Sequence, residues 1–344
     1  MRQKMRTVKL ALVGYGNVGR AFVQMLGKRR AYLAEHCDSE VCITAVCTRS
    51  RGALVSPGGL TPTEIAQGPY QKGCTAFDVI DGAEYDVMVE LTPINIRTGQ
   101  PAIDHIRHAF QRGKHVITAN KGPIAWAYRE LRELARKHHV QFCHEATVMD
   151  GVPVFNLTDE TLKGCKILEV SGILNATTNY VLSEMEHGIS WEDAVAEGQR
   201  RGFVEADPSM DLDGWDAAAK LTALMNVLMD VEITPEEIQR EGIRGITPEQ
   251  MAEARQNHQR LKLLCRGWLE IGRPVGVVAP QAVEADSLYA SINGTAAMVT
   301  ITTDLMGSIS VVEHVYQPEI DQTAYGVFSD LLRVLDSLPP ERRG

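Results

Sequence analysis

The chain has 344 residues, of which 44% are hydrophobic, and its formal net charge is −9. This length can bury two hydrophobic cores, so we expect two domains. The negative charge argues against nucleic acid as a partner, since binding phosphates needs a basic face. No run of about eighteen apolar residues is present, and the basic N-terminus leads straight into an expected strand. We therefore expect a cytoplasmic protein without a membrane span.

Seven cysteines are spread along the chain without a C-x-x-C pair. Most of them lie in apolar runs, as reduced thiols do. This usage fits a reducing compartment and argues against a zinc site.

The N-terminal region has the strand, turn and helix of a dinucleotide-binding site. Val8–Val13 is an apolar strand, GYGNVG follows at Gly14–Gly19, and a helix is expected from Arg20 to about Leu33. The first glycine allows a tight turn, the second lets the backbone approach a pyrophosphate, and the third lets the helix pack on the strand. The helix N-terminus attracts the phosphates. The residues expected at the cofactor here are Gly14, Gly16, Asn17, Val18 and Gly19.

The end of the second expected strand, Glu40–Cys47, bears on the choice of cofactor. An acidic residue there suits the ribose hydroxyls of NAD, whereas a basic group suits the 2′-phosphate of NADP. This chain has Arg49, Ser50 and Arg51 instead of an acid. We favour NADP over NAD, because arginine offers a planar fork for phosphate and serine adds a donor. Two surface arginines, or an arginine stacked on adenine, are the alternatives.

Strands and helices continue to alternate up to about residue 150, which predicts an α/β fold with a doubly wound parallel sheet in residues 1–150. Thr92 and Lys121 each follow the end of an expected strand, where ligands bind in such sheets. Lys121 is expected over the nicotinamide, with a plain surface lysine as the alternative. The elements expected here are strands at Tyr85–Leu91, His115–Ala119 and Val140–Val148, and helices at Gly99–Arg112 and Pro123–His138.

The pattern then changes to that of a second, α+β domain over residues 151–315. Its β-rich runs after Arg260 predict an open sheet whose exposed face supports a homodimer. Residues 316–344 hold a last helix, from Gln322 to about Ser337, which we expect to return to the first domain. The other elements expected are a strand at Lys166–Leu174 and helices at Asn179–Glu186, Trp191–Arg201 and from about Leu212 to Met229.

An acidic motif, GFVEADPSMDLDGWDAAAK at Gly202–Lys220, is the strongest candidate for a substrate site. With a helix starting near Leu212 or Asp213, Asp216 and Lys220 lie at i and i+4 on one face. Carboxylates there can hold an ammonium group, and a lysine among them can transfer a proton. The alternative is a solvated acidic loop that caps a helix.

Five stretches together closely resemble the homoserine dehydrogenase family. They are GYGNVG at Gly14–Gly19, TANKG at Thr118–Gly122, EATVMDGVP at Glu145–Pro153, GILNATTNYVL at Gly172–Leu182, and the acidic motif. The resemblance implies oxidation of L-homoserine to L-aspartate 4-semialdehyde, or the reverse, with NAD or NADP. It implies Lys220 and Lys121 as catalytic lysines, a substrate site of Glu205, Asp216, Asp211 and Thr177, and cofactor contacts from Gly202 and Glu205.

The chemistry of the acidic motif fits this reaction. Hydride transfer to an aldehyde builds negative charge on its oxygen, and a protonated lysine stabilises that charge and completes the alcohol. In this interpretation Asp216 positions Lys220, and Glu205 pairs with the substrate ammonium. Asp207 and Asp213 are interpreted as caps or structural carboxylates.

The resemblance also implies a sodium ion at Glu145–Val152. Its ligands would be Glu145 and the carbonyls of Val148, Asp150 and Val152, hard oxygens that suit such an ion. A hinge between domains, with the turn set by Gly151 and Pro153, is the alternative.

Four departures from the family pattern leave other interpretations open. Tyr316–Asp321 stands where a glycine-rich segment is common, Ala176 replaces a glycine, Trp215 is unusually bulky, and no C-terminal regulatory domain is expected after the last helix. One alternative is an oxidoreductase of the same fold that acts on another small hydroxy acid or aldehyde. The other is a catalytically silent NADP-binding regulator.

Overall fold

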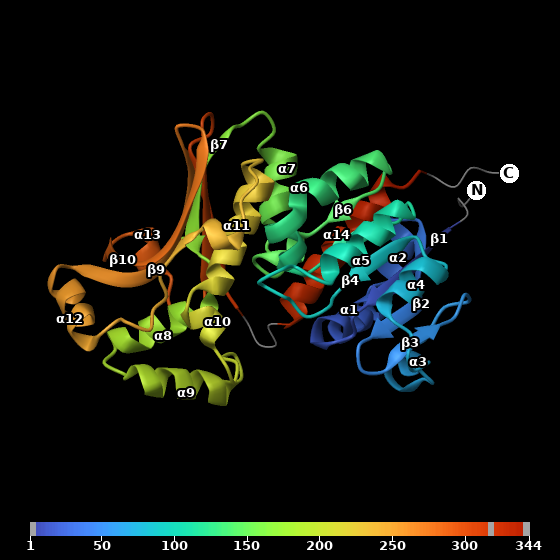
Figure 1. Cartoon of the computed structure of the whole chain (residues 1–344), viewed down its shortest axis with the longest axis horizontal. Coiled ribbons are helices and arrows are strands. Elements are labelled where there is room, and N and C mark those ends of the chain that lie inside the picture. Colours follow the sequence, from blue (N-terminus) through green and yellow to red (C-terminus); the bar gives the residue numbers. More distant parts are fainter. Residues whose placement is uncertain (1–4, 316–319, 340–344) are drawn as a thin grey trace. The chain divides into compact units, whose positions relative to one another are not determined.

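The computed structural model describes residues 5–315 and 320–339. The chain divides into two compact units, one of residues 1–153 together with 317–344 and the other of residues 154–316. In the described residues each unit contains one six-stranded sheet with helices around it (Figure 1). Among these residues no helix combines the length and apolar character needed to cross a bilayer.

The sheet of the first unit has the strand order β3-β2-β1-β4-β5-β6. All neighbours in it are parallel except the edge strand β3, which runs antiparallel to β2. The expected doubly wound α/β fold is confirmed. The strands are β1 (Arg6–Val13), β2 (Ser39–Thr48), β3 (Gly52–Val55), β4 (Val87–Glu90), β5 (His115–Thr118) and β6 (Phe142–Cys143).

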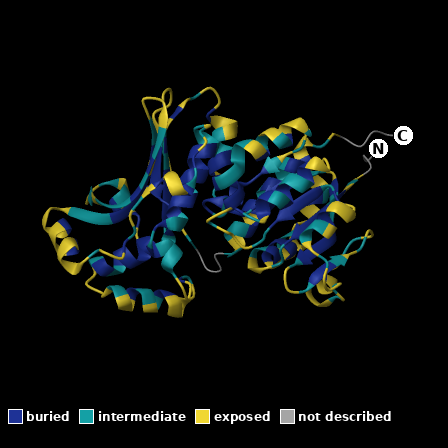
Figure 2. Cartoon of the chain, in the orientation of Figure 1, coloured by how far each residue is buried: buried dark blue, intermediate teal, exposed yellow. Residues whose placement is uncertain are grey.

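Helices cover both faces of this sheet, so its central strands are buried on both sides and read as continuous apolar runs (Figure 2). Two expectations were wrong in detail. The helix expected to reach Leu33 breaks at Arg29, two residues after the weak helix former Gly27, and the strand expected at Val140–Val148 ends at Cys143. The helices are α1 (Asn17–Lys28), α2 (Arg30–His36), α3 (Pro62–Gln67), α4 (Ala76–Gly82), α5 (Ala102–Gln111), α6 (Lys121–Lys137), the 3-10 turn η1 (Glu145–Thr147) and α14 (Ile320–Ser337).

The last helix, α14, belongs to the first unit. Its buried side chains Val327, Phe328 and Leu331 join the core cluster that contains Leu10 of β1 and Phe22 of α1. Helix α14 therefore completes a core that begins with the first strand of the chain.

The sheet of the second unit has the order β12-β11-β7-β9-β10-β8 and is antiparallel apart from the short pairing of β10 with β8. The strands are β7 (Ile167–Ile173), β8 (Gln239–Arg240), β9 (Gln259–Glu270), β10 (Arg273–Glu284), β11 (Ala297–Thr303) and β12 (Ser308–Glu313). The helices are α7 (Val154–Thr161), α8 (Ala176–Glu186), α9 (Trp191–Arg201), α10 (Ser209–Leu212), α11 (Trp215–Leu228), the 3-10 turn η2 (Pro235–Glu237), α12 (Pro248–Gln256) and α13 (Leu288–Ser291).

Helix α11 packs against β7, β9 and β10 of this sheet. It lies close to the strands because glycines face it: a Cβ at Gly267 would lie 2.5 Å from the sulfur of Met225. The helix starts at Trp215, later than expected. Gly214 adopts φ 77°, a left-handed conformation that separates α11 from the short helix α10.

Candidate active site

The glycine motif of the first unit forms a tight turn between β1 and α1. Gly14 has φ 107°, and a Cβ there would lie 2.4 Å from the carbonyl oxygen of Leu91. Gly16 caps α1 without a side-chain hydrogen bond, no acidic residue lies in the first turn, and a Cβ at Gly16 would meet no atom within 4 Å. The start of this helix therefore offers backbone N–H groups and space, which fits the pyrophosphate of a dinucleotide.

The basic residues after β2 have different environments. Arg49 and Ser50 are exposed in the turn. The Arg51 guanidinium lies 4.1 Å from the ring centroid of Tyr70, and its Nη1 donates to the carbonyl of Ala66 at 2.9 Å. Arg51 is thus held by its own unit, whereas Arg49 and Ser50 present their side chains to solvent.

A buried carboxylate that the sequence analysis missed ties together the loops after β4 and β5. Glu90 is fully buried and accepts hydrogen bonds from the Thr92 N–H at 3.0 Å and the Thr118 hydroxyl at 3.1 Å. Asn120 donates from its N–H to the Thr118 hydroxyl oxygen at 3.0 Å and from Nδ2 to the Thr92 carbonyl at 3.2 Å. The sequence feature that could have identified Glu90 is its position as a charged residue at the end of the apolar run VMVE.

This network places Thr92 and Lys121 at the carboxyl edge of the sheet. Asn120 caps α6 by accepting from the Gly122 N–H at 3.0 Å, and Lys121 is the first residue of that helix. A cation in the first turn opposes the helix dipole, so helix stability does not account for a lysine at this position.

The acidic motif of the second unit brings the expected lysine and carboxylate together. Lys220 Nζ lies 3.4 Å from Asp216 Oδ2, across one turn of α11, and donates to the Leu174 carbonyl at 2.9 Å. The two side chains are only 20% and 14% exposed. The predicted i, i+4 contact is therefore confirmed.

Asn175, which the sequence analysis did not single out, links this pair to a second carboxylate. Its Nδ2 donates to Asp211 Oδ1 at 2.7 Å and to Asp216 Oδ2 at 3.0 Å. Burial raises the pKa of Asp211 above its usual range, the neighbouring Asp216 raises it further, and the hydrogen bond from Asn175 and the charge of Lys220 oppose the rise. The nearby Thr177 side chain also favours the ionised form of Asp211 and so lowers its pKa.

The remaining acids of the motif lie outside this cluster. Glu205 is exposed on the loop after α9, and the C-cap of that helix is Gly202, with φ 84°. Asp207 accepts a hydrogen bond from the Ser209 N–H at 3.1 Å, and Asp213 pairs with Arg244 at 2.5 Å. Asp207 and Asp213 thus have the structural contacts that the sequence analysis assigned to them.

Two of the departures from the family pattern lie beside this cluster in the chain. The Arg240 guanidinium, on the edge strand β8, lies 3.8 Å from the ring centroid of Trp215. The Trp215 indole is therefore in contact with the arginine of an edge strand. Ala176 is the first residue of α8, directly after Asn175. Of the segment Tyr316–Asp321, residues 316–319 lie outside the described residues, and the remainder begins α14.

The region proposed for a cation lies against α14. The buried Glu145 donates its N–H to Asp330 Oδ2 at 2.8 Å. Asp150 has φ 45°, and its side chain accepts from the Thr323 hydroxyl at 2.6 Å. The described residues contain no cluster of three or more histidine, cysteine, aspartate or glutamate side chains suited to a metal, so a cation here would depend largely on the carbonyls of Val148, Asp150 and Val152.

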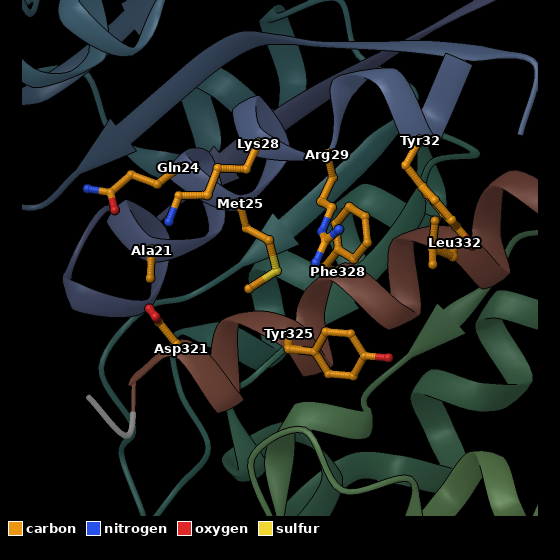
Figure 3. A pocket seen from close by; sticks show the side chains of 10 residues that line it. All are labelled: Ala21, Gln24, Met25, Lys28, Arg29, Tyr32, Asp321, Tyr325, Phe328 and Leu332. Atoms are coloured by element: carbon orange, nitrogen blue, oxygen red, sulfur yellow. The ribbon is translucent and has the colours of Figure 1, made fainter. Parts of the chain in front are cut away.

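A separate groove of about 540 Å³ lies in the first unit between α1, α2 and α14 (Figure 3). Met25 and Phe328 contribute apolar surface, and Lys28, Arg29 and Asp321 contribute charge. None of the predicted site residues lines it. The lining residues are Ala21, Gln24, Met25, Lys28, Arg29, Tyr32, Asp321, Tyr325, Phe328 and Leu332.

A dinucleotide-type turn in one unit and a lysine with two carboxylates in the other define a nicotinamide-dependent oxidoreductase. The family model described as the NAD-binding domain of homoserine dehydrogenase matches residues 14–145, and the model described as homoserine dehydrogenase matches residues 153–332. The chain belongs to the homoserine dehydrogenase family. The family and the type of reaction expected from the sequence motifs are thereby confirmed.

Individual relatives match nearly the whole chain. A homoserine dehydrogenase of Methanocaldococcus jannaschii is 36% identical over 95% of this chain and 98% of its own. An NAD(+)-dependent homoserine dehydrogenase of Pseudomonas canavaninivorans is 33% identical over 97% of each chain. The crystal structure of a homoserine dehydrogenase from Thiobacillus denitrificans, 28% identical, matches with a TM-score of 0.84 over 98% of this chain and 77% of that one.

Proposed function

We propose that the protein interconverts L-homoserine and L-aspartate 4-semialdehyde through an active site built around Lys220. The observation that carries this proposal is the cluster of Asp211, Asp216 and Lys220 on α10 and α11, held by Asn175. A bound nicotinamide dinucleotide supplies the hydride for reduction or accepts it in oxidation.

Lys220 has the chemistry for the proton transfer. As an ammonium ion it stabilises the developing alkoxide oxygen and protonates it, and as an amine it takes the proton back in oxidation. Asp216 keeps this nitrogen in place through the 3.4 Å contact. Asp211, Thr177 and Glu205 are proposed to bind the substrate, with Glu205 on its ammonium group.

Lys121 is proposed as the second catalytic lysine. Its place at the start of α6, beside the Glu90 network, supports a role near the nicotinamide ring rather than in helix stability. Thr92, Gly202 and Glu205 are proposed as further cofactor contacts.

NADP is proposed as the preferred cofactor. The support is the exposed pair Arg49 and Ser50 in the turn after β2, where a 2′-phosphate would lie. Because Arg51 already donates to Ala66, Arg49 is the stronger candidate for this phosphate.

We assign the first unit to the dinucleotide and the second to substrate binding and assembly of a homodimer. A sodium ion bound by Glu145 and the carbonyls of Val148, Asp150 and Val152, and a cytoplasmic location, complete the proposal.

The direct test is an absorbance assay of NADPH oxidation with aspartate semialdehyde, run beside a panel of other small aldehydes. We expect turnover that depends on the semialdehyde. Activity confined to a different aldehyde would overturn the substrate, and cofactor binding without any turnover would overturn the activity.

A further inference from the structure

We infer that Asn175 is a positioning residue that holds Asp211 and Asp216 side by side and thereby fixes Asp216 against the Lys220 ammonium. This inference rests on the proposed function, because it concerns the same cluster. The residue lies between β7 and α8, 36 positions before Asp211 and 41 before Asp216.

The orientation of the Asn175 amide is set by the helix that follows. Asn175 is the N-cap of α8, and its Oδ1 accepts a hydrogen bond from the Thr178 N–H at 2.8 Å. Since the carbonyl end is committed to the helix, the Nδ2 end must point the other way. Both of its hydrogens are then used, one for each carboxylate.

A plain helix cap needs only an acceptor, which serine or aspartate supplies equally well. The two carboxylates need a donor, which among the common capping residues only asparagine offers twice. Asn175 is 4% exposed, so water is a poor substitute for these hydrogen bonds. An asparagine at this position therefore satisfies the two carboxylates as well as the helix cap.

The amide also offsets repulsion between the two acids. Asp211 and Asp216 are close enough for each charge to disfavour the other, and hydrogen bonds to the ionised forms counteract this. Two other ionisable groups of the described residues face them: Lys220 on α11, and Cys265 on β9, a buried thiol whose pKa is raised to about 12 and which stays neutral. Removing the Asn175 donors should therefore raise the pKa of the carboxylate pair.

The test compares two variants that keep the cap, Asn175→Ser and Asn175→Asp, with Thr247→Ala, which removes the cap of α12 in the same unit. We expect kcat to fall by about 10²-fold in both Asn175 variants, because a misplaced acid–base group costs that much. The acidic limb of kcat/KM should move up by about one pH unit, further in Asn175→Asp, which adds a third carboxylate. Thr247→Ala should lower Tm and leave the pH profile unchanged.

A second readout does not need turnover. The free energy of unfolding is measured as a function of pH for the wild type and Asn175→Ser. When folding raises the pKa of a carboxyl group, the free energy of unfolding of the protein falls as the pH rises from the unfolded pKa through the folded pKa. The fall is greater when the folded pKa is higher. The deficit of Asn175→Ser should thus be small below about pH 4 and larger at neutral pH. A deficit independent of pH would overturn the inference.

The double variant Asn175→Asp with Asp211→Asn moves the amide across the hydrogen bond and keeps the net charge. It should bring the pH dependence of unfolding back toward that of the wild type. Wild-type kinetics and pH profile in Asn175→Ser would also overturn the inference. Absence of turnover in the wild type would overturn the proposed function instead and leave the unfolding experiment decisive for Asn175.

Discussion

The two units build their candidate sites in different ways. In the parallel sheet of the first unit, strand ends share one edge, and the site consists of backbone turns there, at Gly14, Thr92 and Asn120. In the mostly antiparallel sheet of the second unit, neighbouring ends alternate, and the chemical groups lie instead on helices α10 and α11 and on the cap of α8. The first kind of site depends on backbone conformation, and the second on side-chain chemistry.

The largest expected effect follows from the side-chain chemistry of the second unit. Lys220→Ala should lower kcat by about 10²–10⁴-fold, the usual contribution of a positioned acid–base group. The affinity for NADPH should stay within about twofold, because Lys220 is assigned to the substrate rather than the dinucleotide. Steady-state kinetics and a fluorescence titration measure the two.

Lys163→Ala is the matched control, since Lys163 is an exposed lysine of the same unit that pairs with Glu160. It should behave as the wild type. A near-normal kcat in Lys220→Ala would remove this lysine from the mechanism.

A pair of glycine substitutions tests the backbone character of the first site. Gly14→Ala should destabilise the fold by about 1–3 kcal/mol, because φ is 107° and the new Cβ would lie 2.4 Å from the Leu91 carbonyl oxygen. Gly16→Ala should leave stability within about 0.5 kcal/mol but weaken NADPH binding about tenfold or more, since the methyl group would occupy space assigned to the pyrophosphate. Urea unfolding and NADPH titration separate them, and normal binding by Gly16→Ala would refute the assigned pyrophosphate position.

The two arginines after β2 should also differ. Arg49→Ala should raise the KM for NADPH about tenfold and leave that for NADH nearly unchanged, because only NADPH carries the 2′-phosphate. Arg51→Ala should instead affect both cofactors alike and lower Tm, since its guanidinium packs on Tyr70 and bonds Ala66. Equal losses for both cofactors in Arg49→Ala would contradict the NADP preference.

The smallest effect concerns Asp211. Its raised folded pKa means that its contribution to stability falls as the pH rises through that pKa, so the ionised group destabilises the fold at neutral pH. Asp211→Asn should therefore stabilise the protein by about 1 kcal/mol at pH 7 and by almost nothing below about pH 4. Thermal unfolding across this range checks it, and a less stable variant at pH 7 would contradict it.

The same contrast explains which parts were predictable from the sequence. The turn at Gly14–Gly19 and the pair Asp216 and Lys220 are local, so their spacing was sufficient to predict them. Asn175 and Glu90 instead form hydrogen bonds with residues 28 to 41 positions away, and no local sequence pattern indicates which residues these are.

Some predicted element boundaries were wrong for a related reason. The strand expected to reach Val148 ends at Cys143, where the chain turns so that the Glu145 N–H can reach Asp330 of α14. Helix α11 begins late because Gly214 takes a left-handed conformation, which the amino-acid type permits but does not require.

The membership of α14 in the first unit has a consequence for biosynthesis. The ribosome makes β1 before α14, with the whole second unit in between. Until Val327, Phe328 and Leu331 leave the exit tunnel, part of the apolar core around Leu10 and Phe22 has no cover. The dinucleotide-binding unit therefore cannot complete its core until the second unit has been translated. This apolar surface must stay protected while some 160 further residues are added.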